Sequence, residues 1–234
     1  EKPLEKMPVE DLLNAFAGYI KALIRQGAED EAVRVIHEDA PKFVKEVEQL
    51  KEIEGIVYME LKRYNDAIEI YKWLSDSDPE NPRYVISLSQ AYNAALKYNE
   101  SEKILLEALK NDPDNTRFLM QIGIVYDATK QFEKAESTIL RVLKAEPENS
   151  LALNNLAYMY IENGKNIGKA ITMVKKALSL EPDNGAFLDT LGWGLFRQGK
   201  FAEAKSNIEQ ALKFSERQDK GVIYDHYGDV LSRM

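Results

Sequence analysis

The chain has 234 residues, of which 44% are hydrophobic and 30% are charged, and its formal net charge at pH 7 is −8. This acidic balance argues against nucleic acid or an anionic membrane surface as the main partner, because both attract clustered Lys and Arg. The absence of cysteine excludes disulfides and thiolate metal sites, but it fits either a reducing or an oxidising compartment.

The two ends of the chain indicate a fragment of a longer protein. The chain starts at Glu1 without an initiator methionine, and it stops at Met234 inside an apolar helical pattern. No apolar run approaches the ~18 residues that a membrane-spanning helix needs, and no signal peptide is visible. We therefore predict no direct membrane insertion by this fragment.

The N-terminal part of the chain is irregular. Residues 1–8 contain two prolines and no apolar period, so they are predicted to form an extended arm. Residues 9–47 predict a divergent helical hairpin that turns at Gly27. From Phe43 to about Leu61 the apolar spacing continues without interruption, after Pro41 in a position that suits a helix start. This pattern predicts one unusually long helix.

Five regular helix pairs follow, and two independent markers give the same period. The prolines that end each second helix differ by 34, 34 and 35 residues, and the apolar residues after each internal turn differ by 34, 34, 35 and 34. A fixed period of this size is typical of a helical solenoid. The predicted pairs are 48–81, 82–115, 116–149, 150–184 and 185–217. The one extra residue falls between Tyr160 and Ile167, in a turn.

The tail, residues 218–234, has apolar residues at helical spacing. Tyr224, Tyr227, Gly228 and Leu231 predict the first helix of a further repeat that lacks its second helix. Such a helix leaves an apolar face open, because a repeat buries that face only against its neighbours.

The pattern resembles the tetratricopeptide repeat. The residues that carry the resemblance best are Leu153, Leu156, Ala157, Tyr160, Ala170, Val174 and Pro182, followed in the next repeat by Leu188, Leu191, Gly192, Leu195, Ala204 and Ile208. The match weakens where Lys51 and Glu54 replace apolar residues around Gly55, where Ser101 replaces alanine, and where Glu216 replaces proline. The resemblance implies an all-α, right-handed superhelix of about six helix hairpins plus a terminal single helix.

Nothing in the sequence predicts catalysis. His37 and His226 are the only histidines, and neither has companions at a spacing that suits a catalytic or zinc site. They are interpreted as ordinary surface or packing residues. The stretch Gly164–Lys169 has no strand before it and Ala170 after it, so it is interpreted as a turn rather than a phosphate loop. We predict no enzyme activity, no catalytic residue, no metal and no cofactor.

The resemblance also implies that the first helices line a concave groove that binds peptides. An apolar stripe on this face suggests a surface that buries a partner. Three positions per repeat, spaced four and then three residues apart, belong to this face, and the first regular pair has Glu52, Ile56 and Met59 there. The predicted partner-binding residues are Ile86, Gln90, Asn93, Met120, Ile124, Asp127, Asn154, Tyr158, Ile161, Asp189, Trp193, Phe196 and Arg197. Two alternatives stay open: these side chains pack on one another, or Leu4 and Met7 of the arm fill the groove.

The resulting interpretation is a protein-interaction scaffold or adaptor that binds a protein or peptide. The residues on this face do not match the carboxylate clamp of chaperone-binding repeats, nor the asparagine ladder of sugar transferases. A substrate-docking arm of a larger enzyme and a self-assembling homo-oligomer are the alternatives. The C-terminal repeats also resemble those of bacterial cell-envelope lipoproteins, which favours a periplasmic or outer-membrane-associated location over a cytoplasmic one.

Overall fold

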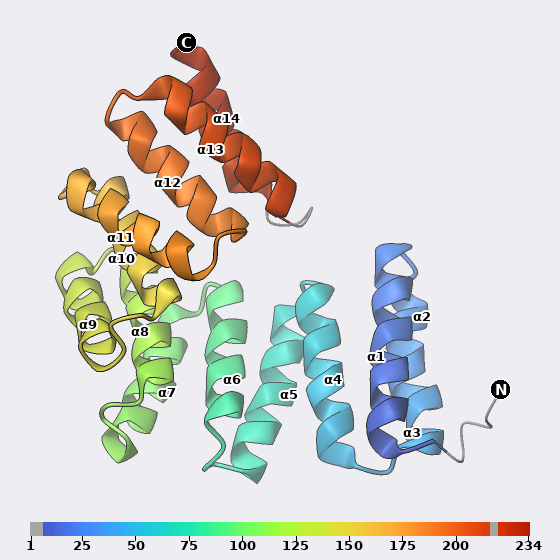
Figure 1. Ribbon diagram of the computed structural model, residues 1–234. Coiled ribbons are helices and arrows are strands. Elements are labelled where there is room, and N and C mark those ends of the chain that lie inside the picture. Colours follow the sequence, from blue (N-terminus) through green and yellow to red (C-terminus); the bar gives the residue numbers. More distant parts are fainter. Residues whose placement is uncertain (1–6, 216–219) are drawn as a thin grey trace. The chain divides into compact units, whose positions relative to one another are not determined.

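The computed structural model describes residues 7–215 and 220–234, and within these ranges it contains helices and no strand. The predicted all-α class is therefore confirmed. Contacts divide the chain into two compact units, Glu1–Thr129 (unit 1) and Lys130–Met234 (unit 2). Figure 1 labels the helices of both units. Residues 1–6, which include Leu4 and most of the predicted arm, lie outside the described residues, as does Glu216.

Unit 1 begins with an irregular helical hairpin. Helix α1 (Val9–Arg25) leads through Gly27, whose φ is +78°, into α2 (Glu29–Arg34). The chain continues as the π-helix η2 (Val35–Asp39) and the short α3 (Ala40–Phe43). These helices share a core with the next helix of the chain, α4 (Val47–Glu60). Its buried residues are Ile20, Leu23, Ala32, Val35, Ile36, Ala40 and Val57.

The prediction of one long helix from Phe43 to Leu61 is wrong. Helix α3 ends at Phe43, and Val44 has an extended backbone with φ −107° and ψ 124°. This conformation turns the Val44 side chain into the interior, where it is 1% exposed, while Val47 at the start of α4 is 56% exposed. The apolar spacing runs through the break because both helices bury residues in the same core. Periodicity alone therefore does not reveal the interruption.

The rest of unit 1 consists of regular helices. Helix α4 pairs with α5 (Tyr64–Ser77), and α6 (Pro82–Ala94) pairs with α7 (Tyr98–Asn111), before α8 (Thr116–Ala128). A Cβ atom at Gly55 would lie 2.7 Å from the ring of Tyr71, so the small residue lets α4 and α5 approach closely. At the corresponding position of α6, the hydroxyls of Ser89 and Ser101 share a hydrogen bond of 2.8 Å, which satisfies both buried groups.

Unit 2 contains α9 (Phe132–Ala145), α10 (Ser150–Glu162), α11 (Ile167–Leu180), α12 (Gly185–Arg197), α13 (Phe201–Phe214) and α14 (Lys220–Ser232). Helices α12, α13 and α14 lie side by side (Figure 1). Their packing buries Ile208 completely and leaves Leu195 3% exposed. The fold is thus a helical repeat in which the paired helices are followed by the single helix α14, as predicted.

The junctions between repeats follow the chemistry of the sequence. Each Asn before a first helix accepts a hydrogen bond from a backbone N–H two or three residues later, which is an N-cap. The four capping residues are Asn81, Asn115, Asn149 and Asn184. The turn with the extra residue is the only one among the described helix pairs with two left-handed residues, Gly164 (φ +65°) and Asn166 (φ +51°).

Candidate partner-binding surface

In unit 1 the predicted groove residues lie on the first helices. The central positions of α4, α6 and α8 hold Ile56, Gln90 and Ile124, spaced by one repeat. Ile56 is 54% exposed, Ile124 is 37% exposed, and Gln90 is exposed between them. The surface that these helices present, which we call the unit 1 face, consists of Glu52, Ile56, Met59, Ile86, Gln90, Asn93, Met120, Ile124 and Asp127.

The other positions of the unit 1 face are less accessible. Ile86, Asn93 and Asp127 are half-buried, whereas Met120 is buried. The accessible apolar surface of this face therefore centres on Ile56 and Ile124.

Two polar residues of the unit 1 face, Glu52 and Asn93, differ in their hydrogen bonding. Glu52 accepts hydrogen bonds from the Tyr84 hydroxyl at 2.7 Å and from Arg83 at 3.3 Å. The bond to Glu52, together with burial, raises the pKa of Tyr84 to about 12. Asn93, in contrast, has a buried Oδ1 with no hydrogen-bond partner among the described residues. An unused acceptor of this kind is costly unless something donates to it.

In unit 2 the predicted residues lie on α10 and α12, and several are buried. Asn154 is 7% exposed, Asp189 is 6% exposed and Ile161 is fully buried. Tyr158, Trp193 and Phe196 are half-buried, and Arg197 is exposed. We call these seven residues the unit 2 face: Asn154, Tyr158, Ile161, Asp189, Trp193, Phe196 and Arg197.

Aromatic stacking explains why Trp193 is only partly exposed. Its ring stacks on Phe196, with the centroids 4.9 Å apart and the planes at 13°, and on His226, at 4.3 Å and 10°. The indole Nε1 donates to Glu162 at 2.6 Å. Much of the indole is therefore covered by the chain itself.

His226 connects α14 to α12. Its Nδ1 lies 2.9 Å and 3.1 Å from the two carboxylate oxygens of Asp189, and both residues are buried. The sequence interpretation of His226 as a packing residue did not include this contact. The repeat spacing aligns Asp225 with Asp189, whereas the structure places His226 against α12. Asp189, a predicted partner-binding residue, thus pairs with His226 within unit 2.

The other histidine, His37, is exposed and contacts a buried carboxylate of unit 1. Glu54 is 7% exposed and accepts hydrogen bonds from Lys51 at 2.6 Å and from His37 Nε2 at 2.9 Å. Burial raises the pKa of Glu54, but the bonds from Lys51 and His37 outweigh it, so the pKa lies below the usual value of 4.5. Glu54 departs from the repeat motif because its bond to His37 ties the irregular hairpin to α4, while Lys51, on α4 itself, pairs with the same buried carboxylate.

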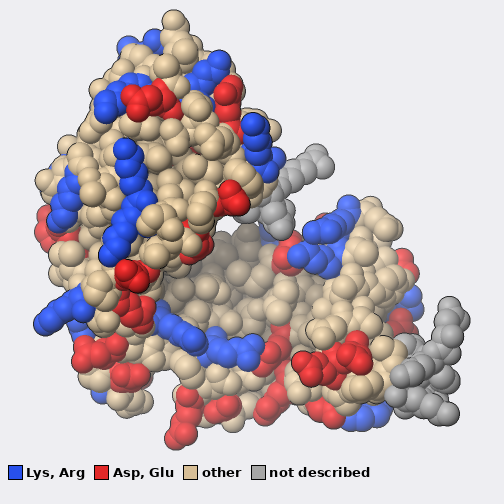
Figure 2. Space-filling model, viewed as in Figure 1, with Lys and Arg blue, Asp and Glu red and all other residues tan. Residues whose placement is uncertain are grey.

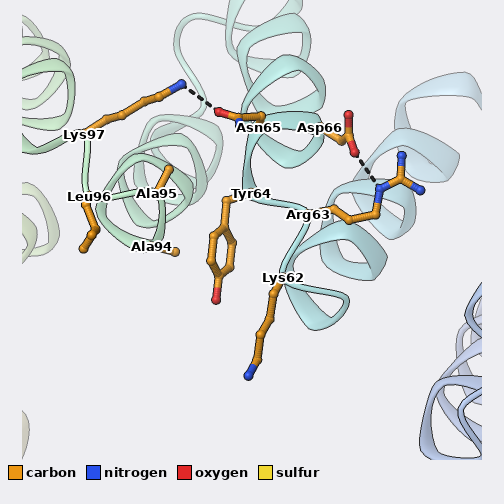
Figure 3. A pocket seen from close by; sticks show the side chains of 9 residues that line it. All are labelled: Lys62, Arg63, Tyr64, Asn65, Asp66, Ala94, Ala95, Leu96 and Lys97. Carbon is orange, nitrogen blue, oxygen red and sulfur yellow. Dashed lines mark hydrogen bonds and ion pairs between the residues drawn. The ribbon is translucent and has the colours of Figure 1, made fainter.

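A hollow of about 500 Å³ lies on unit 1 between two successive turns. Figure 3 shows its lining residues, Lys62–Asp66 and Ala94–Lys97. Lys97 donates to Asn65 at 2.7 Å, and Arg63 pairs with Asp66 at 2.6 Å. Because two of its three basic side chains already have partners, this hollow is a weak candidate for an anion site.

Other kinds of site find little support. In residues 7–215 and 220–234 no group of three or more His, Cys, Asp or Glu side chains is arranged to hold a metal ion. No described helix is both long and apolar enough to cross a membrane. Figure 2 shows Lys and Arg interspersed with Asp and Glu on the visible face, without a single large basic patch.

The central repeats of the chain match sequence models of a known protein family. Residues 58–120 and 94–157 match a model described as a tetratricopeptide repeat, and residues 151–184 match a second model with the same description. Together these matches span more than half of the chain. The chain belongs to the tetratricopeptide repeat family. No curated protein sequence matches it.

Solved structures of tetratricopeptide repeat proteins share the fold. A thermophilic member from Thermus thermophilus is 19% identical and has a TM-score of 0.68, over 79% of this chain and 99% of that chain. A member from Parabacteroides merdae is 16% identical and has a TM-score of 0.75, over 94% and 84% of the two chains. Tetratricopeptide repeats are in general non-catalytic scaffolds that bind proteins or peptides, and this chain has their architecture.

Proposed function

We propose that this tetratricopeptide repeat protein is a non-catalytic scaffold whose first-helix faces bind a protein or peptide partner. The observation that carries the proposal is the exposure of Ile56 and Ile124 on the unit 1 face. Both occupy the central position of a first helix, two repeats apart. Burying a fully exposed aliphatic side chain of this size contributes about 1.5–3 kcal/mol. Ile56 and Ile124 are 54% and 37% exposed, so covering each contributes part of that value and favours a partner with apolar side chains.

The polar residues of the unit 1 face fit this role. Gln90 lies between the two isoleucines along the repeat, and it is exposed. Asn93 has the unused buried acceptor on the same helix. The proposed contact set in unit 1 is therefore Ile56, Ile86, Gln90, Asn93, Ile124 and Asp127, with Met120 contributing by packing.

The unit 2 face has a different proposed role. Ile161 and Asp189 are buried, and Asp189 bonds His226, so we assign both to holding the helices together. Asn154 is also buried, but its Oδ1 has no hydrogen-bond partner among the described residues, as at Asn93. The proposed contact residues that remain are Tyr158, Phe196 and Arg197, with the accessible part of Trp193. Stacking and the bond to Glu162 fix the Trp193 ring before binding, and a pre-ordered aromatic side chain loses little conformational freedom when a partner covers it.

The test compares two double variants by affinity capture from native extract. Ile56→Ser with Ile124→Ser removes the proposed anchors. Trp73→Ser with Leu106→Ser is the matched control, because these residues lie on second helices of unit 1 and are 43% and 44% exposed. We expect a specific protein to be lost from the anchor variant and retained by the control, with unchanged helicity in both.

Equal capture by both double variants would contradict the proposal. Loss from the control alone would move the binding surface to the second helices. The envelope location suggested by the C-terminal repeats stays a prediction, which fractionation of the native cells tests.

A further inference from the structure

The charged residues of the chain are divided unevenly between the two units. Unit 1 contains 25 of the 39 Asp and Glu residues and 16 of the 31 Lys and Arg residues, whereas unit 2 contains 14 and 15. The negative net charge of the protein therefore belongs to unit 1, which also carries the exposed anchors Ile56 and Ile124. Such an excess favours a partner of opposite charge, because the summed field of the unit attracts it.

The unit 1 face has charged groups of one sign. Its nine residues include the carboxylates of Glu52 and Asp127 and no Lys or Arg. A third carboxylate, that of Glu60, follows Ile56 by four residues, just as Glu52 precedes it by four. Residues four apart are neighbours on a helix surface, so the most exposed anchor of the face lies between two carboxylates of α4.

The basic residues of α4, α6 and α8 do not neutralise this group. These helices contain Lys51, Arg83 and Arg117. Lys51 bonds the buried Glu54 and Arg83 bonds Glu52, while Arg117 lies in the first turn of α8. Lys62, in the turn after α4, lines the hollow of Figure 3. The carboxylate of Glu60 is exposed and has no ion pair or hydrogen bond within the described residues.

An equivalent residue of unit 2 shows where a carboxylate at the Glu60 position extends. Glu162 occupies this position three repeats later, and it accepts a hydrogen bond of 2.6 Å from Trp193, at the central position of the next first helix. In unit 1 the residue at that central position is Gln90. Glu60 therefore lies where it can extend over the unit 1 face, between Ile56 and Gln90. The end of the chain does not create this opening, because α4 and α6 are both paired with their second helices.

The same end of the face has an unused acceptor. Asn93 follows Gln90 by one turn of α6, and its buried Oδ1 has no partner among the described residues. Glu60 and Asn93 both lie in the last turn of their helices, where the helix dipole is negative. A carboxylate, an amide oxygen and two helix C-termini thus gather beside an exposed isoleucine. Lys and Arg side chains carry positive charge and several donors, so they suit this combination.

We propose that the occupant of the unit 1 face is a cationic segment of a protein partner, in which Lys or Arg side chains accompany aliphatic ones. The aliphatic side chains cover Ile56 and Ile124, and a Lys or Arg side chain reaches Glu60 and Asn93. An acidic segment would instead bring like charges together around Ile56. The inference rests on the proposed function, because it names the chemistry of the partner for the same face.

The test selects a displayed library of random peptides on the wild-type protein and on the double variant Ile56→Ser with Ile124→Ser. Peptides that bind the wild type and not the variant depend on the anchors. Among these peptides we expect Lys, Arg and aliphatic residues to be enriched and Asp and Glu to be depleted.

Charge variants then test Glu60 with one anchor-dependent peptide, by fluorescence anisotropy. Glu60→Lys should weaken binding about tenfold or more, because it brings like charges together at the interface. Glu69→Lys is the matched control, since Glu69 is an exposed carboxylate on the second helix α5 and the net charge changes equally. The control should bind like the wild type, and both variants should keep their helicity because the two positions are exposed.

The outcomes separate this inference from the proposed function. Anchor-dependent peptides without an excess of Lys and Arg would overturn the inference and leave the proposed function standing. The absence of any anchor-dependent peptide would contradict both. Equal weakening by Glu60→Lys and Glu69→Lys would show that the peptide responds to the net charge of the protein rather than to the unit 1 face, which would also overturn the inference.

Discussion

Gly192 provides a direct test of the close packing between α12 and α13. In Gly192→Ala the new methyl group would lie 2.5 Å from Cγ1 of Ile208 and 3.1 Å from the carbonyl oxygen of Ala204. Ile208 is fully buried, so its side chain has no free space into which to move, and the carbonyl belongs to the α13 backbone. Overpacking of this kind costs about 1–3 kcal/mol.

The helix itself would gain from the same substitution. Replacing glycine by alanine inside a helix contributes about 1 kcal/mol, which offsets part of the clash. We therefore expect Gly192→Ala to lower the free energy of unfolding by up to about 2 kcal/mol, and the melting temperature by up to roughly 8 °C for a chain of this length. Gly192→Leu should lower the free energy of unfolding further, because its longer side chain meets the same Ile208 side chain and Ala204 carbonyl.

Gly228→Ala is the matched control, because Gly228 occupies the same repeat position with no atom within 4 Å of a Cβ. At Gly228 the substitution causes no clash, and alanine favours the helix more than glycine does. The free energy of unfolding should therefore rise by about 0.5–1 kcal/mol. The assay is thermal unfolding followed by far-ultraviolet circular dichroism. A Gly192→Ala variant that melts above the wild-type temperature, as Gly228→Ala should, would refute the packing argument.

Three further predictions concern other parts of the chain. Because the pKa of Glu54 is lowered in the folded state, its stabilisation is present above the usual value of 4.5 and is lost as pH falls through the folded-state pKa. Glu54→Gln should therefore show a smaller fall in melting temperature on acidification than the wild type. An identical fall would contradict a contribution of Glu54 to the pH dependence of stability. Leu96 is 73% exposed and has a φ of +59°. This conformation costs a side chain about 1–2 kcal/mol, so Leu96→Gly should stabilise unit 1 by about 0.5–1 kcal/mol in urea unfolding, and a loss of stability would contradict it. His226→Phe keeps a ring for stacking but leaves the buried carboxylate of Asp189 without its donor. It should destabilise by about 1–3 kcal/mol and speed amide hydrogen exchange in α14, while unchanged exchange would show that the hydrogen bond does not hold that helix.

The repeat architecture could be predicted because its causes are local. The proline and asparagine junctions, the small residues and the apolar spacing recur every 34 or 35 residues, and each acts within one or two neighbouring helices. The irregular hairpin has no such repetition. Its π-helix and the break at Val44 depend on how several helices share one core, so the spacing from Phe43 to Leu61 predicted the wrong helix.

The candidate surface also has features that local sequence predicts and features that depend on packing between helices. The sequence by itself determined which side chains lie on the first-helix faces, since helical spacing fixes a face. It could not determine which of them remain available. Ile56 stays open, whereas Trp193 is covered by His226, a residue far along the chain on another helix. Exposure depends on contacts between residues distant in sequence, so only the tertiary structure decided that unit 1 offers open aliphatic anchors and unit 2 a pre-ordered aromatic cluster.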